Sequence, residues 1–243
     1  MTATLIPTLT IARRELASMF RLPVGWVVIA LFLVLTASVV ALSIQPGAPA
    51  SLRGFFTLSA WLLMPVAPAV SMRLLAEERR TGTDEMLLTS PVSVLGVVVG
   101  KFLGAWFFLL CMLVPTLVYP VLLVAISDPR PDLGPMVSGY ILLLLQGTLY
   151  LAIGTAVSSM TSNQTLAYLA TLFPILALLL AGSLASESLP EVLRPIHDAL
   201  QISRRAGDFA RGIIDTGHVV FFLAASAWCL ALAHAGLEWR KWR

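Results

Sequence analysis

The chain has 243 residues, of which 58% are hydrophobic and only 12% are charged, and its formal net charge is +3. The apolar share is well above that of soluble domains and the charged share well below it, so a water-soluble globular fold is excluded. The basic residues do not form runs with interleaved aromatic residues, which argues against a nucleic-acid partner. They lie beside apolar segments, as expected of a protein embedded in a lipid bilayer.

The first expected element is an amphipathic helix over residues 1–21. Arg14, Ser18 and Arg21 share one face, and this pattern predicts a helix that lies along the membrane interface. A soluble helix packed on another domain is the alternative, and it is disfavoured because the sequence holds no such domain. The apolar residues that recur at helical spacing are Leu5, Leu9, Ala12, Leu16, Met19 and Phe20.

Six apolar stretches follow, each long enough for a membrane-spanning helix. A bilayer core about 30 Å thick needs roughly 20 apolar residues per helix. The predicted fold class is therefore all-α, a polytopic membrane protein with six transmembrane helices in a single domain. We expect the spans over residues 22–44, 54–72, 102–127, 134–157, 165–186 and 216–237, with an outer loop over 187–215.

Prolines and one polar cluster interrupt these stretches. Proline inside a helix removes a backbone hydrogen bond, so the second and third spans should bend and pack closely or line a wet cavity. The polar cluster over residues 158–164 marks a hairpin between the fourth and fifth spans. The prolines concerned are Pro65, Pro68, Pro115 and Pro120.

The distribution of Lys and Arg predicts the orientation. With six spans both termini share one side, and ten of the sixteen basic residues fall on that side against six on the other. Because Lys and Arg collect in cytoplasmic loops, both termini should be cytoplasmic. The ten are Arg13, Arg14, Arg21, Arg73, Arg79, Arg80, Lys101, Arg240, Lys241 and Arg243.

The loop between the second and third spans holds most of the remaining cytoplasmic charge. Thr83 is a plausible helix N-cap, with Asp84 and Glu85 in the first turn, where carboxylates meet the positive end of a helix. We therefore expect a short cytoplasmic helix over about residues 84–89. A Ser-Pro pair at positions 90 and 91 predicts a second helix leading into the third span.

Few ionisable side chains lie within the expected spans. No carboxylate lies in the central part of any span, and His218 and His234 are sixteen residues apart on one helix, too far to share a site. Metal-ligand spacing is also missing, so a membrane enzyme is disfavoured. An ion-coupled transporter usually keeps an intramembrane acid or Lys, and this chain does not. Energy for any transport should come from elsewhere.

A glycine repeat marks the start of the third span. Gly96, Gly100 and Lys101 resemble the end of a phosphate-binding loop, but the spacing is one residue short and Phe102 stands where Ser or Thr is needed. Together with Gly104, the glycines repeat every four residues instead, the pattern of close helix packing.

The stretch from residue 76 to residue 101 closely resembles the cytoplasmic loop of ABC type-2 transporter permeases, nearest to the gliding-motility-associated group. Gly154 to Gln164 and Ala210 to Asp215 resemble later parts of the same family. The matching positions in the first stretch are Glu77, Glu78, Arg79, Gly82, Thr83, Glu85, Leu87, Leu88, Pro91, Gly100 and Lys101.

The resemblance implies a non-catalytic permease subunit of an ATP-driven exporter in the bacterial cytoplasmic (inner) membrane. It implies a dimer with a second copy or a sibling permease, and a partner ATP-binding subunit that carries ATP and Mg²⁺, so this chain needs no cofactor. The loop helix would be the coupling helix. A membrane scaffold that binds the ATPase without transport is the alternative. The implied ATPase-coupling residues are Glu77, Glu78, Arg79, Arg80, Gly82, Thr83, Asp84, Glu85, Leu87, Leu88 and Pro91.

Overall fold

The computed structural model describes residues 2–44, 51–82, 93–127, 131–181 and 202–241. Within these ranges every regular element is a helix, which confirms the all-α fold class. In chain order they are α1 (Thr2–Arg21), α2 (Pro23–Ser43), α3 (Arg53–Ser71), α4 (Ala76–Thr81), α6 (Val94–Leu113), the 3-10 turn η1 (Val114–Leu117), α7 (Val118–Ile126), α8 (Leu133–Met160), α9 (Gln164–Ala181), α11 (Ile202–Phe209) and α12 (Thr216–Lys241).

Five helical segments of the described chain are long and apolar enough to cross a membrane. They are α2, α3 continued by α4, α6 continued through α7, α8, and α12. The sixth expected span corresponds to α9, which is an apolar helix of shorter described length and ends where the described residues end. A membrane protein with at least five candidate spans is therefore confirmed, and the sixth span stays a prediction.

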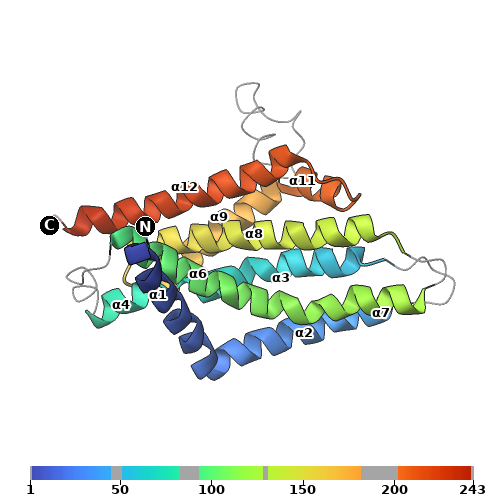
Figure 1. Cartoon of the computed structure of the whole chain (residues 1–243), viewed down its shortest axis with the longest axis horizontal. Coiled ribbons are helices and arrows are strands. Elements are labelled where there is room, and N and C mark those ends of the chain that lie inside the picture. The colour runs from blue at the N-terminus through green and yellow to red at the C-terminus, as the bar shows by residue number, and fades with distance from the viewer. Residues whose placement is uncertain (1, 45–50, 83–92, 128–130, 182–201, 242–243) are drawn as a thin grey trace.

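The long helices lie side by side in a bundle (Figure 1). α1 begins and α12 ends at the same end of the bundle, which we call the terminal end, and α4 lies there too. α11 lies toward the opposite end, the distal end. The side of the membrane that each end faces stays a prediction.

The structure places the breaks in the spans. The third span changes from α-helix to a 3-10 turn at Pro115, whereas α3 continues through Pro65 and Pro68 as one helix. The expected hairpin is confirmed, because α8 ends at Met160 and α9 begins at Gln164.

The helix of the third span begins before Lys101, in agreement with the predicted second helix that leads into this span. Its helix starts at Val94, where the Ser93 hydroxyl accepts a hydrogen bond from the Gly96 amide at 3.2 Å. It then runs without a break through Lys101, beside which the span was expected to start. Lys101 itself is buried at 2% exposure, and where the membrane edge falls along this helix stays a prediction.

The glycine repeat of α6 packs against α1, as predicted for Gly100 and Gly104. A Cβ on Gly100 would lie 2.8 Å from the backbone oxygen of Thr8, and one on Gly104 would lie 3.0 Å from that of Ala12. Ala12 is accordingly buried, but Leu9, also assigned to the apolar face, is 65% exposed. α1 is therefore fixed to the bundle by backbone contact, and its interfacial position in a membrane stays a prediction.

Candidate functional site

Four charged side chains from three helices meet at the terminal end of the bundle. Lys101 Nζ of α6 lies 2.8 Å from Glu78 Oε1 of α4 and 3.4 Å from Glu15 Oε2 of α1. Arg14 of α1 adds a longer contact, 3.6 Å from Glu78 Oε1. We call Arg14, Glu15, Glu78 and Lys101 the charge cluster. It joins the N-terminal helix, the short helix after α3 and the start of the third span.

The local sequence explains why Glu78 is available on a helix. Glu77 and Glu78 occupy the first turn of α4 and Arg79 and Arg80 its last turn, the arrangement that the helix dipole favours. Gly82 ends the helix in the left-handed conformation at φ +69°, and its amide bonds back to the carbonyls of the last turn. Such a cap strongly favours glycine.

Three of the four charges of the cluster are largely buried and must therefore be paired. The side chain of Lys101 is 2% exposed, that of Glu15 14% and that of Glu78 17%. A buried ammonium group needs a nearby anion, because removing an unpaired ion from water into a protein interior costs about several kcal/mol. Burial also raises the pKa of Glu15; the Lys101 charge opposes this shift and the Glu78 charge adds to it.

The structure divides the expected coupling residues into two groups. Glu78 points into the cluster, whereas the side chains of Glu77 and Arg80 are exposed. Arg79 is half-buried, and Gly82 caps the helix. The remaining residues of the prediction lie outside the described residues, as does the expected helix over 84–89; they are Thr83, Asp84, Glu85, Leu87, Leu88 and Pro91.

Ser158 is a positioning residue that the sequence pattern did not reveal. Its hydroxyl oxygen accepts hydrogen bonds from the amides of Leu75 at 3.1 Å and Ala76 at 3.0 Å, and its proton is donated to the Met72 carbonyl at 3.2 Å. The first amides of a helix have no partner within the helix. One side chain of α8 thus supplies the missing partners where α3 turns into α4.

Replacing Ser158 with alanine should loosen α4. The Leu75 and Ala76 amides would then be buried without an acceptor, at a cost of roughly 1 to 3 kcal/mol. We expect faster hydrogen exchange of these two amides, measured by mass spectrometry on the purified chain. Ser159→Ala is the matched control, since its hydroxyl donates only to the Ala156 carbonyl of its own helix; equal exchange in both variants would contradict the assignment.

Glu15 was also missed, although the sequence carries a signal for it. It lies three residues after Ala12 and four before Met19, both members of the predicted apolar face. Residues at that spacing share a helix face. A single carboxylate on an apolar face requires a buried cation, and Lys101 meets that requirement.

The two histidines of α12 each pair with a nearby carboxylate. His218 Nε2 lies 2.9 Å from Asp208 Oδ2 at the distal end, and His234 Nε2 lies 3.4 Å from Glu238 Oε1 at the other end of α12. Among the described residues no group of three or more His, Cys, Asp and Glu side chains is placed to hold a metal ion. The charge cluster links α1, α4 and α6 to one another.

One comparison with known proteins matches the chain. A family model described as "ABC-2 family transporter protein" matches residues 45–200, more than half of the length. The matched region includes Glu78, Lys101 and Ser158, whereas Glu15 lies before it. None of the curated proteins compared with the chain matches it.

Proposed function

The chain belongs to the ABC-2 family of transporter proteins, and from that membership we propose that it is the permease subunit of an ATP-driven exporter. ABC-2 permeases are multi-pass membrane subunits that are normally non-catalytic and work with an ABC ATP-binding subunit. The match is at the level of the family, so membership of the gliding-motility-associated group stays a prediction.

The observation that carries the proposal is the way α4 is fastened. α4 follows α3 directly, its start is held by Ser158 of α8, and Glu78 ties it to Lys101 of α6 and thereby to α1. A displacement of α4 is thus passed to four helices. We propose that the ATP-binding subunit docks against the exposed face of α4, which carries Glu77 and Arg80, and against the loop that follows it.

Several finer assignments belong to the same proposal. The terminal end faces the cytoplasm of a bacterium, with the chain in the inner membrane as one permease domain over residues 1–243. ATP and Mg²⁺ bind the partner, and a second copy or a sibling permease completes the translocation path. The excess of basic residues on the terminal side supports this orientation.

Reversing the exposed charges of α4 tests the docking. We expect Glu77→Lys combined with Arg80→Glu to lower co-purification with the ATPase encoded beside this gene about tenfold, because rim charges control association. The melting temperature of the permease should fall by only a few degrees, since both side chains are exposed and only their interaction with the α4 dipole is reversed. Arg211→Gln, exposed near the distal end, is the control.

Unchanged binding and unchanged stimulation of ATP hydrolysis in the double variant would contradict the docking model. Reconstituted vesicles separate transport from the alternative role. ATP hydrolysis that is stimulated by the permease but moves no substrate would favour a membrane scaffold.

A further inference from the structure

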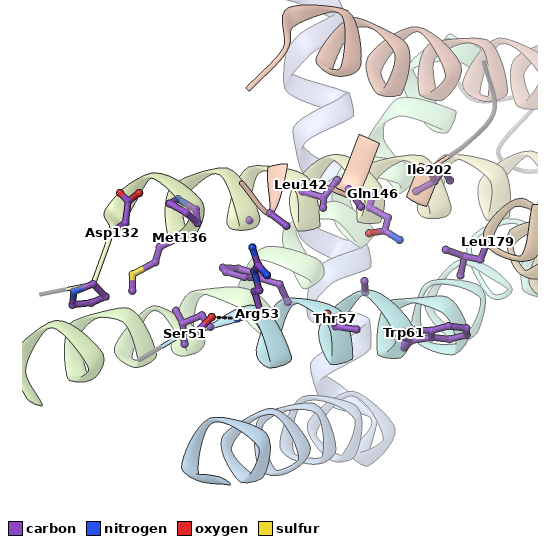
Figure 2. A pocket seen from close by; sticks show the side chains of 18 residues that line it. Ser51, Arg53, Thr57, Trp61, Asp132, Met136, Leu142, Gln146, Leu179 and Ile202 are labelled. Carbon is purple, nitrogen blue, oxygen red and sulfur yellow. Dashed lines mark hydrogen bonds between the residues drawn. The ribbon is translucent and has the colours of Figure 1, made fainter. Parts of the chain in front are cut away.

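A cavity of about 560 Å³ opens between α3, α8, α9 and α11, away from the charge cluster (Figure 2). Its volume lies within the roughly 300 to 1,000 Å³ of small-molecule sites. Its polar lining comes from Ser51, Arg53, Thr57, Asp132 and Gln146, and most of the other lining side chains are apolar. Such a lining, largely apolar with a few placed polar groups, is typical of a ligand site.

Gln146 supplies the strongest indication of a ligand. Its side chain is 2% exposed and points from α8 toward α3 across the cavity (Figure 2). The amide Nε2 donates to the Tyr150 hydroxyl at 2.6 Å, but Oε1 is buried without a hydrogen-bond partner in the described part of the chain. Buried polar atoms are nearly always satisfied in proteins. A group that enters the cavity and donates to Oε1 would satisfy this one.

Arg53 supplies a charge nearer the distal end. Arg53, Thr57 and Trp61 recur every four residues, so they form one face of α3, and all three line the cavity. The Arg53 guanidinium points toward α8 and makes no ion pair with any described residue. Asp132 also lines the mouth, but its Oδ1 caps α8 by accepting from the Gly134 amide at 2.9 Å. An unpaired cation is therefore available to an anionic group.

The two polar anchors are far apart along the cavity. Gly139 packs against the Phe56 ring, which sets the level of α8 beside α3. α3 and α8 run parallel, because Gly154 of α8 meets Ser71 of α3 just as Gly139 meets Phe56. Gln146 lies seven residues further along α8 and Arg53 lies three residues back along α3, which separates the two backbone positions by about 15 Å at the helical rise per residue. Leu142 lies between them and Leu179 lies beyond Gln146 (Figure 2), and both apolar side chains line the cavity.

The wall contributed by α11 is held in place by polar contacts. The Ser138 hydroxyl of α8 donates to the Phe209 carbonyl at 2.6 Å, and Asp208 pairs with His218 of α12 at 2.9 Å. Ile202 and Ala206 of the same helix line the cavity. The cavity is therefore a built feature of one protomer.

We propose that this cavity binds an elongated anionic amphiphile, with its head beside Arg53, its apolar body along Leu142 and Leu179, and a mid-chain hydroxyl or amide that donates to Gln146 Oε1. The apolar stretch of the lining disfavours a strongly hydrated solute, because few polar groups there can replace the solute's hydration shell. The binding is independent of the proposed export, since it requires neither an ATPase nor movement of the ligand.

Fluorescence provides the test, because Trp61 lines the cavity. The full chain is placed in phosphatidylcholine nanodiscs, and 9,10-dibromostearate is added as a quencher. Trp26 and Trp228 are exposed on other spans, so quencher dissolved in the bilayer also reaches them. The cavity signal is therefore the saturable part of the quenching, and we expect this part to be lost in Trp61→Phe. 12-Hydroxystearate should displace the quencher at a concentration about five- to tenfold lower than stearate does. This ratio is what one additional buried hydrogen bond contributes to affinity. Stearylamine, which carries a cationic head, should not displace it.

Two variants separate the anchors. Arg53 lies at the exposed mouth. Arg53→Gln should lower the affinity for both stearate and 12-hydroxystearate about tenfold, while the preference for the hydroxylated acid remains. Gln146→Leu should abolish the preference and leave stearate binding unchanged. Equal saturable quenching in Trp61→Phe, displacement by stearylamine, or unchanged affinities in Arg53→Gln would each overturn the proposal, and each can be read without any transport measurement.

Discussion

Replacing Lys101 with methionine should destabilise the chain by roughly 3 to 5 kcal/mol, the range for breaking a buried ion pair by removing one partner. Methionine has a similar length but no charge, so Glu15 and Glu78 would remain as buried carboxylates without the cation that separates them. Arg14 cannot replace Lys101, because it lies 3.6 Å from Glu78 and its side chain is 67% exposed.

The stability of Lys101→Met should depend on pH in a direction that the pKa of Glu15 determines. Burial already raises the pKa of Glu15 above its ordinary value of 4.5, and Lys101 opposes that shift. In Lys101→Met the opposition is lost, so the folded variant takes up protons at a higher pH than the unfolded chain does. Its stability should therefore rise as the pH falls from neutral through the raised pKa of Glu15. The wild type gains less stability over the same interval, because Lys101 opposes the rise in the pKa of Glu15, so the difference between the two proteins should shrink in acid.

Unfolding in mild detergent, followed from pH 7 to pH 5, measures the difference. The control is the triple variant Lys101→Met, Glu15→Gln, Glu78→Gln, which removes all three charges and should recover most of the loss. If Lys101→Met lowers the free energy of unfolding by less than about 1 kcal/mol, Lys101 behaves like a solvent-exposed ion pair and the prediction is wrong. Failure of the triple variant to recover would show that the loss does not come from unpaired charge.

The second large effect is expected at Gly154. A Cβ at this position of α8 would overlap Ser71 Oγ of α3, lie 2.5 Å from Ser71 Cβ and lie 3.3 Å from Thr171 Cγ2 of α9. Ser71 Cβ is attached to the backbone, so relief requires α3 itself to move. We expect Gly154→Ala to cost about 3 kcal/mol, the upper part of the range for overpacking.

A size exchange tests the cause. Ser71→Gly removes the two overlapping atoms, and the Ser71 hydroxyl donates mainly to the Ala67 carbonyl of its own helix, so the change exposes no long-range partner. The double variant should regain most of the stability, less about 1 kcal/mol for a glycine within a helix. Gly207→Ala in α11 meets no atom within 4 Å and should be neutral or slightly stabilising. Equal melting of Gly154→Ala and Gly207→Ala would contradict the close packing.

Much of the fold could be predicted from the spacing of charges and apolar residues. The stretches assigned to spans one, two, four and six coincide with α2, α3, α8 and α12 to within a few residues. They could be predicted because a helix that crosses a bilayer needs about 20 apolar residues and must satisfy its backbone hydrogen bonds within itself. The polar cluster ending at Gln164 predicted the hairpin for a similar local reason. Asn163 Oδ1 accepts from the Thr165 amide at 2.9 Å and so starts α9.

The site could be predicted only in part. The acidic and basic residues of α4 are adjacent in the chain, and their pattern predicted a charged element between two spans. That pattern did not distinguish Glu78, which faces inward, from Glu77, which faces outward. The distinction depends on how α4 is rotated against α6 and α8, and neighbouring residues of a helix point about 100° apart.

The sequence by itself thus determined the class of molecule, most of its spans and the loop in which its charge is concentrated, because hydropathy and capping are local properties. Only the tertiary structure decided that Lys101 is a buried member of the charge cluster. Its partners Glu15 and Glu78 come from other helices, and Ser158 reaches α4 from a distance of more than 80 residues along the chain. Contacts of this kind arise from helix packing, where glycines such as Gly100 let backbones approach, and no local pattern encodes which charges then meet.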